Sequence, residues 1–113
     1  MQDYNTYMRR LYYIINPDDS ISFNQWVKVI EKLIFTMQTE NLPDKDISRT
    51  VTAILQCIAR GTVSGEDYRM QMLEGYSYLG NSDMHRKLAK AKEGGHLVPT
   101  SNLYNLLVFK LNL

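Results

Sequence analysis

The sequence predicts a single all-α domain, a compact bundle of five or six short helices that spans residues 1–113. Three observations lead to this fold class. Apolar side chains recur at steps of three and four residues along most of the chain, which is the spacing of one helix face. Short turns rich in Gly, Pro, Asn and Asp separate these segments. Apolar residues make up 44% and charged residues 22% of the chain, as in an ordinary folded domain.

The first expected helix covers about residues 4–15 and ends at the Asn-Pro-Asp-Asp turn of residues 16–19. Its predicted buried face consists of Tyr4, Met8, Leu11, Tyr12 and Ile15. The strongest helical pattern follows between Ser22 and Glu40, with a single stripe of Phe23, Trp26, Val27, Ile30, Leu33, Ile34 and Met37. Ser22 and Gln25 form a capping box at its start. We expect the other helices to pack around this second helix.

The third expected helix follows Pro43 and ends at Arg60 and Gly61, a basic last turn and a glycine cap. Its apolar stripe consists of Ile47, Val51, Ile54, Leu55 and Ile58. A fourth helix is predicted over residues 68–79, after a second capping pattern at Ser64. Gly75 lies inside this helix, which indicates either a close helix crossing or a break.

A fifth, weakly apolar helix is expected over residues 83–93, with Met84, Leu88 and Ala91 facing inward. The segment 103–113 fits two structures. A sixth helix that starts at Thr100 or Ser101 would place Leu103, Leu106 and Leu107 inward. The alternation of Leu107, Phe109, Leu111 and Leu113 is also typical of a strand, whose edge would need a partner such as a second copy. The helix is favoured because no other segment reads convincingly as a strand.

Three helix–loop–helix junctions share a pattern in which a short loop, an apolar residue and a Ser or Thr precede a helix. They lie around Ile21, around Val63 and, more loosely, at residues 95–100. The pattern faintly resembles the EF-hand, with Ile21 and Val63 at the central apolar loop position. Calcium requires a bidentate Glu late in the loop, where Gln25 and Asp67 stand. The resemblance therefore implies a calcium-independent scaffold that clasps a partner helix, although helix capping alone also produces this pattern.

Several classes of chemistry have no support in the sequence. The single cysteine, Cys57, lies in an apolar helical stretch and is expected to be a buried hydrophobe. His85 and His96 lack the spacing of metal ligands, and no catalytic or phosphate-binding motif is present, so we expect no metal, no cofactor and no enzymatic activity. No apolar run approaches the ~18–20 residues of a membrane span, and no signal peptide is recognisable. These observations predict a soluble cytoplasmic protein.

The predicted function is that of a non-catalytic protein–protein interaction or regulatory module that presents helix faces to a partner. Four tyrosines crowd the first helix, and one helix face cannot bury all of them. Exposed Tyr, Met and Arg are typical of protein interfaces. The candidate partner-binding residues are Tyr7, Tyr13, Arg9, Arg10 and Met70. The partner is another protein, and a second copy in a homodimer is one candidate.

The alternative prediction is a nucleic-acid-binding regulator that uses the basic segment 85–92. The cations of this segment that would contact phosphates are Arg86, Lys87, Lys90 and Lys92. The same pattern also fits a solvated helix face with cations near its C-terminus, where the helix dipole favours them. The sequence alone does not separate these two interpretations.

Overall fold

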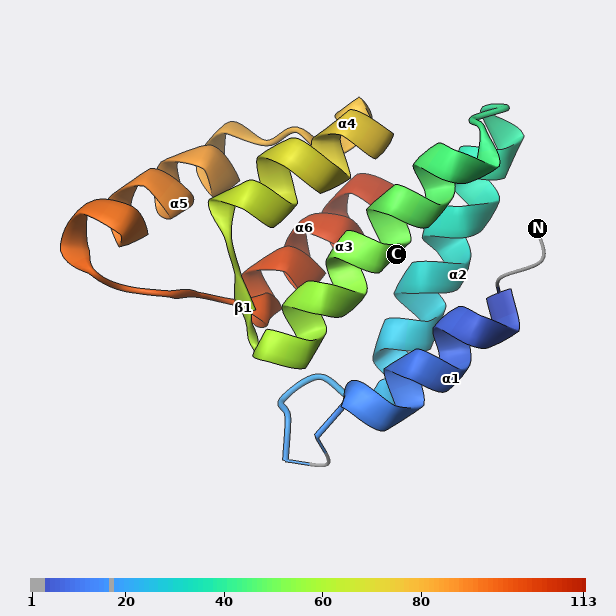
Figure 1. Cartoon of the computed structure of the whole chain (residues 1–113), viewed down its shortest axis with the longest axis horizontal. Helices are drawn as coiled ribbons and strands as arrows, with labels where there is room; N and C mark the ends of the chain where they lie inside the picture. The colour runs from blue at the N-terminus through green and yellow to red at the C-terminus, as the bar shows by residue number, and fades with distance from the viewer. Residues whose placement is uncertain (1–3, 17) are drawn as a thin grey trace.

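The predicted all-α fold is confirmed by a computed structural model, which describes residues 4–16 and 18–113. Over these residues the chain is 77% helical, with six α-helices and one small two-stranded sheet (Figure 1). In chain order the elements are α1 (Tyr4–Ile14), α2 (Phe23–Thr39), α3 (Asp44–Arg60), β1 (Thr62–Val63), the π-helix η1 (Glu66–Met72), α4 (Leu73–Gly75), the 3₁₀-helix η2 (Ser77–Leu79), α5 (Ser82–Gly94), β2 (Val98–Pro99) and α6 (Thr100–Leu111).

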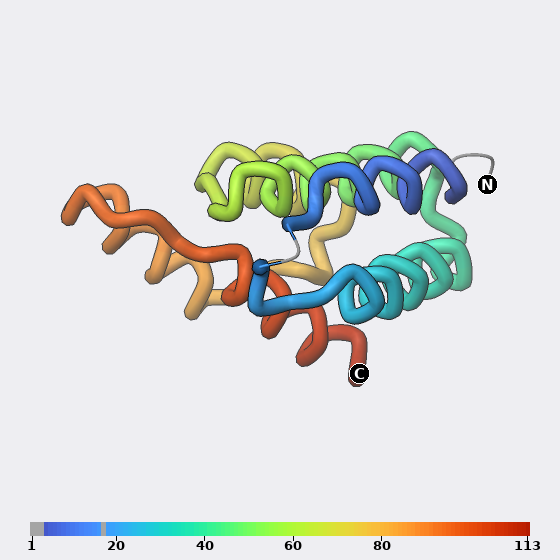
Figure 2. The backbone as a smooth tube through the Cα atoms, turned by 90° about the horizontal axis from the view of Figure 1, so that it is seen from below, coloured from blue at the N-terminus to red at the C-terminus, as the bar shows by residue number. Residues whose placement is uncertain are grey.

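The helices form two layers. Viewed edge-on, α1 and α3 lie in one layer, α2 and α6 lie in the other, and α5 extends beyond them at one end (Figure 2). α3 is the central element, because it packs against α1, α2, β1, η1 and α4. The expectation that the bundle packs around the second helix is therefore wrong. The physical reason is that α3 also buries the small residues Thr50, Ala53 and Cys57, which let neighbours approach it closely.

The apolar stripes of α2 and α3 are largely as predicted. All five residues of the α3 stripe are buried, and five of the seven stripe residues of α2 are buried, while Phe23 and Val27 are half-buried. The Ser22 capping box is also confirmed, since Ser22 Oγ accepts from Gln25 N at 3.2 Å and Gln25 Oε1 accepts from Ser22 N at 2.8 Å. Gly61 ends α3 in the left-handed conformation, with φ of 78°.

The buried face of α1 differs from the predicted one. Tyr7 and Leu11 are buried, whereas Tyr12, expected inside, is 67% exposed. Tyr12 instead stacks edge-to-face on Tyr13 and on Phe23 at the surface, with ring centroids 5.7 and 5.9 Å apart. The helix is thus rotated toward Tyr7, a neighbouring face that the sequence spacing fits almost equally well.

The predicted fourth helix is not continuous. The chain is a π-helix over residues 66–72 and an α-helix over residues 73–75, and it breaks at Tyr76, whose φ and ψ are −151° and 91°. Gly75 marks both a close crossing and this break. A Cβ at Gly75 would lie 2.1 Å from Thr50 Oγ1 and 2.7 Å from the Asp46 carbonyl oxygen. Only glycine therefore lets α4 approach α3 this closely.

The sheet joins two loops that are far apart in sequence. β1 and β2 are antiparallel, with Val63 opposite Val98 and Thr62 opposite Pro99. Each strand has two residues, which is too short to leave an alternating pattern in the sequence. The C-terminal segment is the helix α6, as favoured, and it begins directly after Pro99. The pairing of β1 with β2 places the start of η1 beside the end of α5, where the candidate site lies.

Candidate functional site

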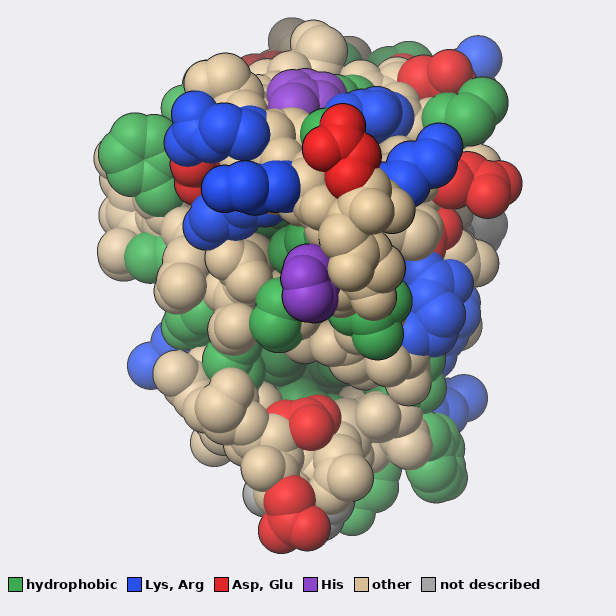
Figure 3. All heavy atoms as spheres, turned by 90° about the vertical axis from the view of Figure 1, so that its left-hand side faces the viewer, with side chains coloured by type: hydrophobic (Ala, Val, Ile, Leu, Met, Phe, Trp, Pro, Cys, Tyr) green, Lys and Arg blue, Asp and Glu red, His purple; other side chains and the backbone are tan. Residues whose placement is uncertain are grey.

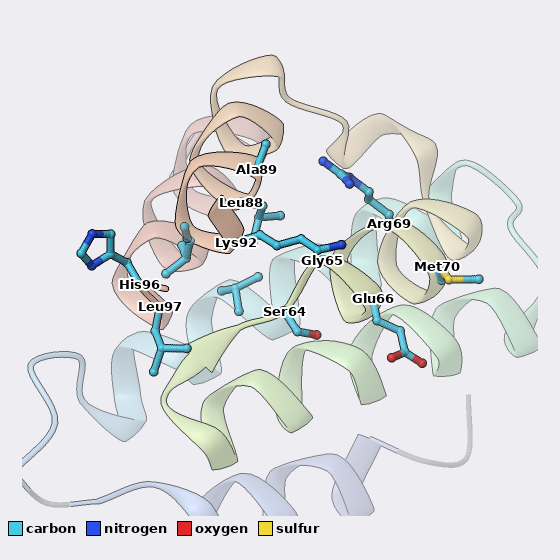
Figure 4. Close-up of a pocket in the computed structure, with 13 residues that line it drawn as sticks. Ser64, Gly65, Glu66, Arg69, Met70, Leu88, Ala89, Lys92, His96 and Leu97 are labelled. Carbon is cyan, nitrogen blue, oxygen red and sulfur yellow. The ribbon is translucent and has the colours of Figure 1, made fainter. Parts of the chain in front are cut away.

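A groove of about 530 Å³ lies between α5 and η1, at the place where β1 and β2 meet (Figure 4). α5, β1 and β2 each contribute one side chain to its apolar floor. Val63 comes from β1, Leu88 from α5 and Val98 from β2, and these side chains are 4%, 7% and 5% exposed. The floor is therefore continuous with the core, and the walls are helices held by that core.

Two large apolar side chains stand in solvent on the rim of this groove. Leu97, in the connection between α5 and β2, is 75% exposed, and Met70, on η1, is 56% exposed. Exposed apolar side chains scattered singly are ordinary in folded proteins. Leu97 borders a groove whose floor is already apolar, which extends the apolar surface open to solvent. The Met70 side chain is directed away from α5, on the far side of η1 (Figure 4).

The polar groups at the rim are mainly cationic. Lys92 extends from α5 toward Gly65, and the Arg69 guanidinium points from η1 toward α5 (Figure 4). Arg69 Nε donates to His85 Nδ1 at 3.2 Å. Among the described residues, neither Arg69 nor Lys92 forms an ion pair. The Glu66 side chain points away from α5 (Figure 4), so uncompensated positive charge borders the groove.

Ionic contacts fix the η1 wall to α3 at both of its ends. At the start, Ser64 Oγ accepts from Asp67 N at 3.0 Å, and the buried Asp67 carboxylate pairs with Arg60. Near the end, Arg49 donates to the Met70 carbonyl oxygen at 3.1 Å and pairs with Glu74 at 2.6 Å. π-Helices are rare and appear mostly as single-turn bulges inside α-helices, frequently at functional sites. The π-helix η1 spans seven residues and forms one wall of the groove.

The structure separates the predicted partner-binding residues. The expected exposure of Tyr7 is wrong, because its side chain is 6% exposed and belongs to the core. Tyr13, at 77% exposed, and the exposed Arg9 and Arg10 lie on α1, which does not line the groove. Met70 alone of this set borders the groove.

The basic segment 85–92 divides into two pairs of cations. Arg86 pairs with Asp83, and Lys87 Nζ lies 3.3 Å from Asp83 Oδ2. The hydrogen bond from Lys87 and the neighbouring positive charges lower the pKa of the Asp83 carboxyl. Lys90 and Lys92 are exposed and form no ion pair with any residue that the structure describes. Lys and Arg side chains gather on the upper part of this end of the molecule, with Asp or Glu side chains among them (Figure 3).

Cys57 is fully buried, as expected, and its Sγ lies 3.9 Å from Asp67 Oδ2. Burial raises the pKa of this thiol, which disfavours the reactive thiolate. Over residues 4–16 and 18–113, no three His, Cys, Asp or Glu side chains are grouped so that they could hold a metal ion. Nor does any helix in these ranges have the length and apolarity to cross a bilayer.

Among the groove residues, sequence reasoning named Met70 as a protein-binding candidate and Lys92 as a nucleic-acid-binding candidate, and it predicted Leu88 to be buried. Leu97 could have indicated the site from the sequence, because it is an apolar residue in the turn between Gly95 and Pro99. The packing of a helix face does not require an apolar residue there. The groove itself depends on the β1–β2 pair, which joins residues 35 positions apart at Val63 and Val98. Comparison of the chain with protein-family models, curated proteins and solved structures gave no match. The geometry of the groove therefore carries the functional inference.

Proposed function

We propose that the protein is a non-catalytic interaction module that binds a segment of a partner protein in the groove between α5 and η1. One observation carries this proposal: the apolar floor of the groove, formed by Val63, Leu88 and Val98, is open to solvent and is bordered by the 75% exposed side chain of Leu97. Full burial of a Leu or Met side chain contributes about 1.5–3 kcal/mol. A partner that covers Leu97 gains this free energy without any rearrangement of the core.

The dimensions of the groove favour a short segment over a broad flat interface. Its volume of about 530 Å³ lies within the range of clefts that enclose small ligands or a few side chains. The arrangement thus suits an extended or helical peptide that inserts one or two apolar side chains.

A nucleic-acid-binding regulator remains the second candidate function, because Lys and Arg gather at this end of the molecule (Figure 3). The Asp83 carboxylate forms ion pairs with Arg86 and Lys87. Lys90 and Lys92 are therefore the unpaired cations of the segment among the described residues. Two phosphate contacts would give a salt-dependence slope of about −2, far below that of proteins with six to ten contacts. The charge balance therefore supports the protein partner more strongly.

The proposal is tested by quantitative co-purification of the tagged chain from extracts of its own source. The groove variant combines Leu97→Ser with Met70→Ser, and the matched control is Phe109→Ser, a 73% exposed aromatic on α6 outside the groove. We expect a partner that the wild type and the control retain and the groove variant loses, with unchanged circular dichroism in all three. A groove variant that keeps every partner would contradict the proposal. Partners that disappear after nuclease treatment would favour the nucleic-acid function instead.

A further inference from the structure

We infer that the segment bound in the groove is acidic, with an apolar side chain flanked by Asp or Glu residues. This inference rests on the proposed function and specifies the partner's chemistry. Both helical walls of the groove present a cation, Arg69 from η1 and Lys92 from α5 (Figure 4). An apolar anchor seated on Val63 and Leu88 therefore has positive charge on either side of it.

The positive charge continues beyond the groove. A second hollow of about 320 Å³ shares Leu97 with the groove and is lined by the unpaired Lys90 from α5. Lys87 also lines this hollow, but it pairs with Asp83 and donates to Asn102 Oδ1 at 2.9 Å. Leu97 and Val98 line both hollows, so the apolar surface is shared between them. A segment that crosses Leu97 meets Arg69 and Lys92 in the groove and Lys90 in the second hollow. Acidic residues on both sides of the apolar anchor match this arrangement.

The carboxylates near the groove do not cancel this charge. The Glu66 side chain lines the groove but is directed away from α5 (Figure 4). Asp83 is engaged by Arg86 and Lys87. Glu93 follows Lys92 on α5 but does not line either hollow. The groove thus offers an apolar floor under a cationic rim, which attracts acidic segments and repels basic ones.

The rim cations are exposed, so each favourable charge pair is expected to change affinity roughly two- to five-fold and to weaken as salt screens it. Binding is measured by fluorescence anisotropy with three peptides that carry an uncharged dye. Their sequences are EELFDEE, the neutral QQLFNQQ and the basic KKLFRKK. We expect the acidic peptide to bind about five-fold more tightly than the neutral one at low salt, and the basic peptide to bind most weakly.

Two variants assign the effect to the rim. Lys92→Gln is expected to weaken binding of the acidic peptide about three-fold and to leave binding of the neutral peptide unchanged. The matched control, Lys28→Gln, removes an exposed cation of α2 outside the groove and is expected to change neither. Equal binding of the acidic and neutral peptides would overturn the acidic preference while the proposed function stands. Failure of all three peptides to bind would overturn both. Tighter binding of an oligouridine, with the same dependence on Lys92, would assign the rim to nucleic acid.

Discussion

The substitution Gly75→Ala tests the packing that places η1 and α4 on α3. A new Cβ would lie 2.1 Å from Thr50 Oγ1 and 2.7 Å from the Asp46 carbonyl oxygen. The Thr50 side chain has some freedom to turn away, but the Asp46 carbonyl belongs to the backbone of α3 and does not. Relief of the second contact therefore requires α4 to move away from α3.

The expected loss of stability follows from two opposing effects. Overpacking of a closely packed site costs typically about 1–3 kcal/mol, and the fixed carbonyl places Gly75→Ala at the upper end. Alanine in a helix is favoured over glycine by about 1 kcal/mol. The difference leaves a net destabilisation of about 2 kcal/mol, which corresponds to a fall in Tm of roughly 8 °C for a domain of this size.

Urea unfolding followed by Trp26 fluorescence measures this loss, because the indole is 2% exposed in the folded protein and reports its exposure on unfolding. Thr50→Ala provides the second arm of a double-mutant cycle. It removes Oγ1, for which the structure shows no hydrogen-bond partner. We expect the double variant to recover about 1 kcal/mol of the Gly75→Ala loss. Gly75→Ala protein as stable as wild type would refute the close crossing of α3 and α4.

Three further predictions concern single side chains. Ser22→Ala removes the capping box of α2 and is expected to lower the free energy of unfolding by about 1 kcal/mol in urea; an unchanged midpoint would contradict this. The hydrogen bond to Glu31 raises the pKa of Tyr4 from 10.0 to about 12. The folded state holds the Tyr4 proton more tightly than the unfolded state does. The stability that this hydrogen bond contributes is therefore complete below pH 10 and is lost as the pH rises toward 12. Tyr4→Phe should therefore flatten the alkaline loss of stability, and identical pH profiles would count against the contact. Cys57 should react with a thiol reagent only at the rate of unfolding, because burial raises its pKa and blocks access; rapid reaction of the native protein would show that the site opens.

Local patterns in the sequence were sufficient to predict most helices and their ends. The stripes of α2 and α3 have a strict helical period, and Ser22 and Gly61 are residues whose chemistry acts within one turn of the chain. These features depend on neighbours in sequence and need no knowledge of the fold. The local pattern of segment 103–113 fits either a helix or a strand. In the structure this segment is a helix, and it packs against α2.

The errors arise where distant segments determine the structure. Tyr7 and Tyr12 lie about 140° apart around the axis of α1, on opposite sides of Leu11. The positions of α2 and α3 decide which of them is buried. The π-helix depends on anchors such as Arg60, which lies on another element. The groove depends on the pairing of Val63 with Val98. Periodicity within one segment carries no information about these contacts.

The central claim is that a partner binds between α5 and η1, and chemical-shift mapping tests it most directly. The amide resonances of the ¹⁵N-labelled chain are followed while the acidic peptide EELFDEE is added. The account predicts shifts concentrated at residues 63–70 and 88–98, which line the groove. Shifts concentrated on α1 around the exposed Tyr12 and Tyr13, or no shifts at millimolar peptide, would contradict it.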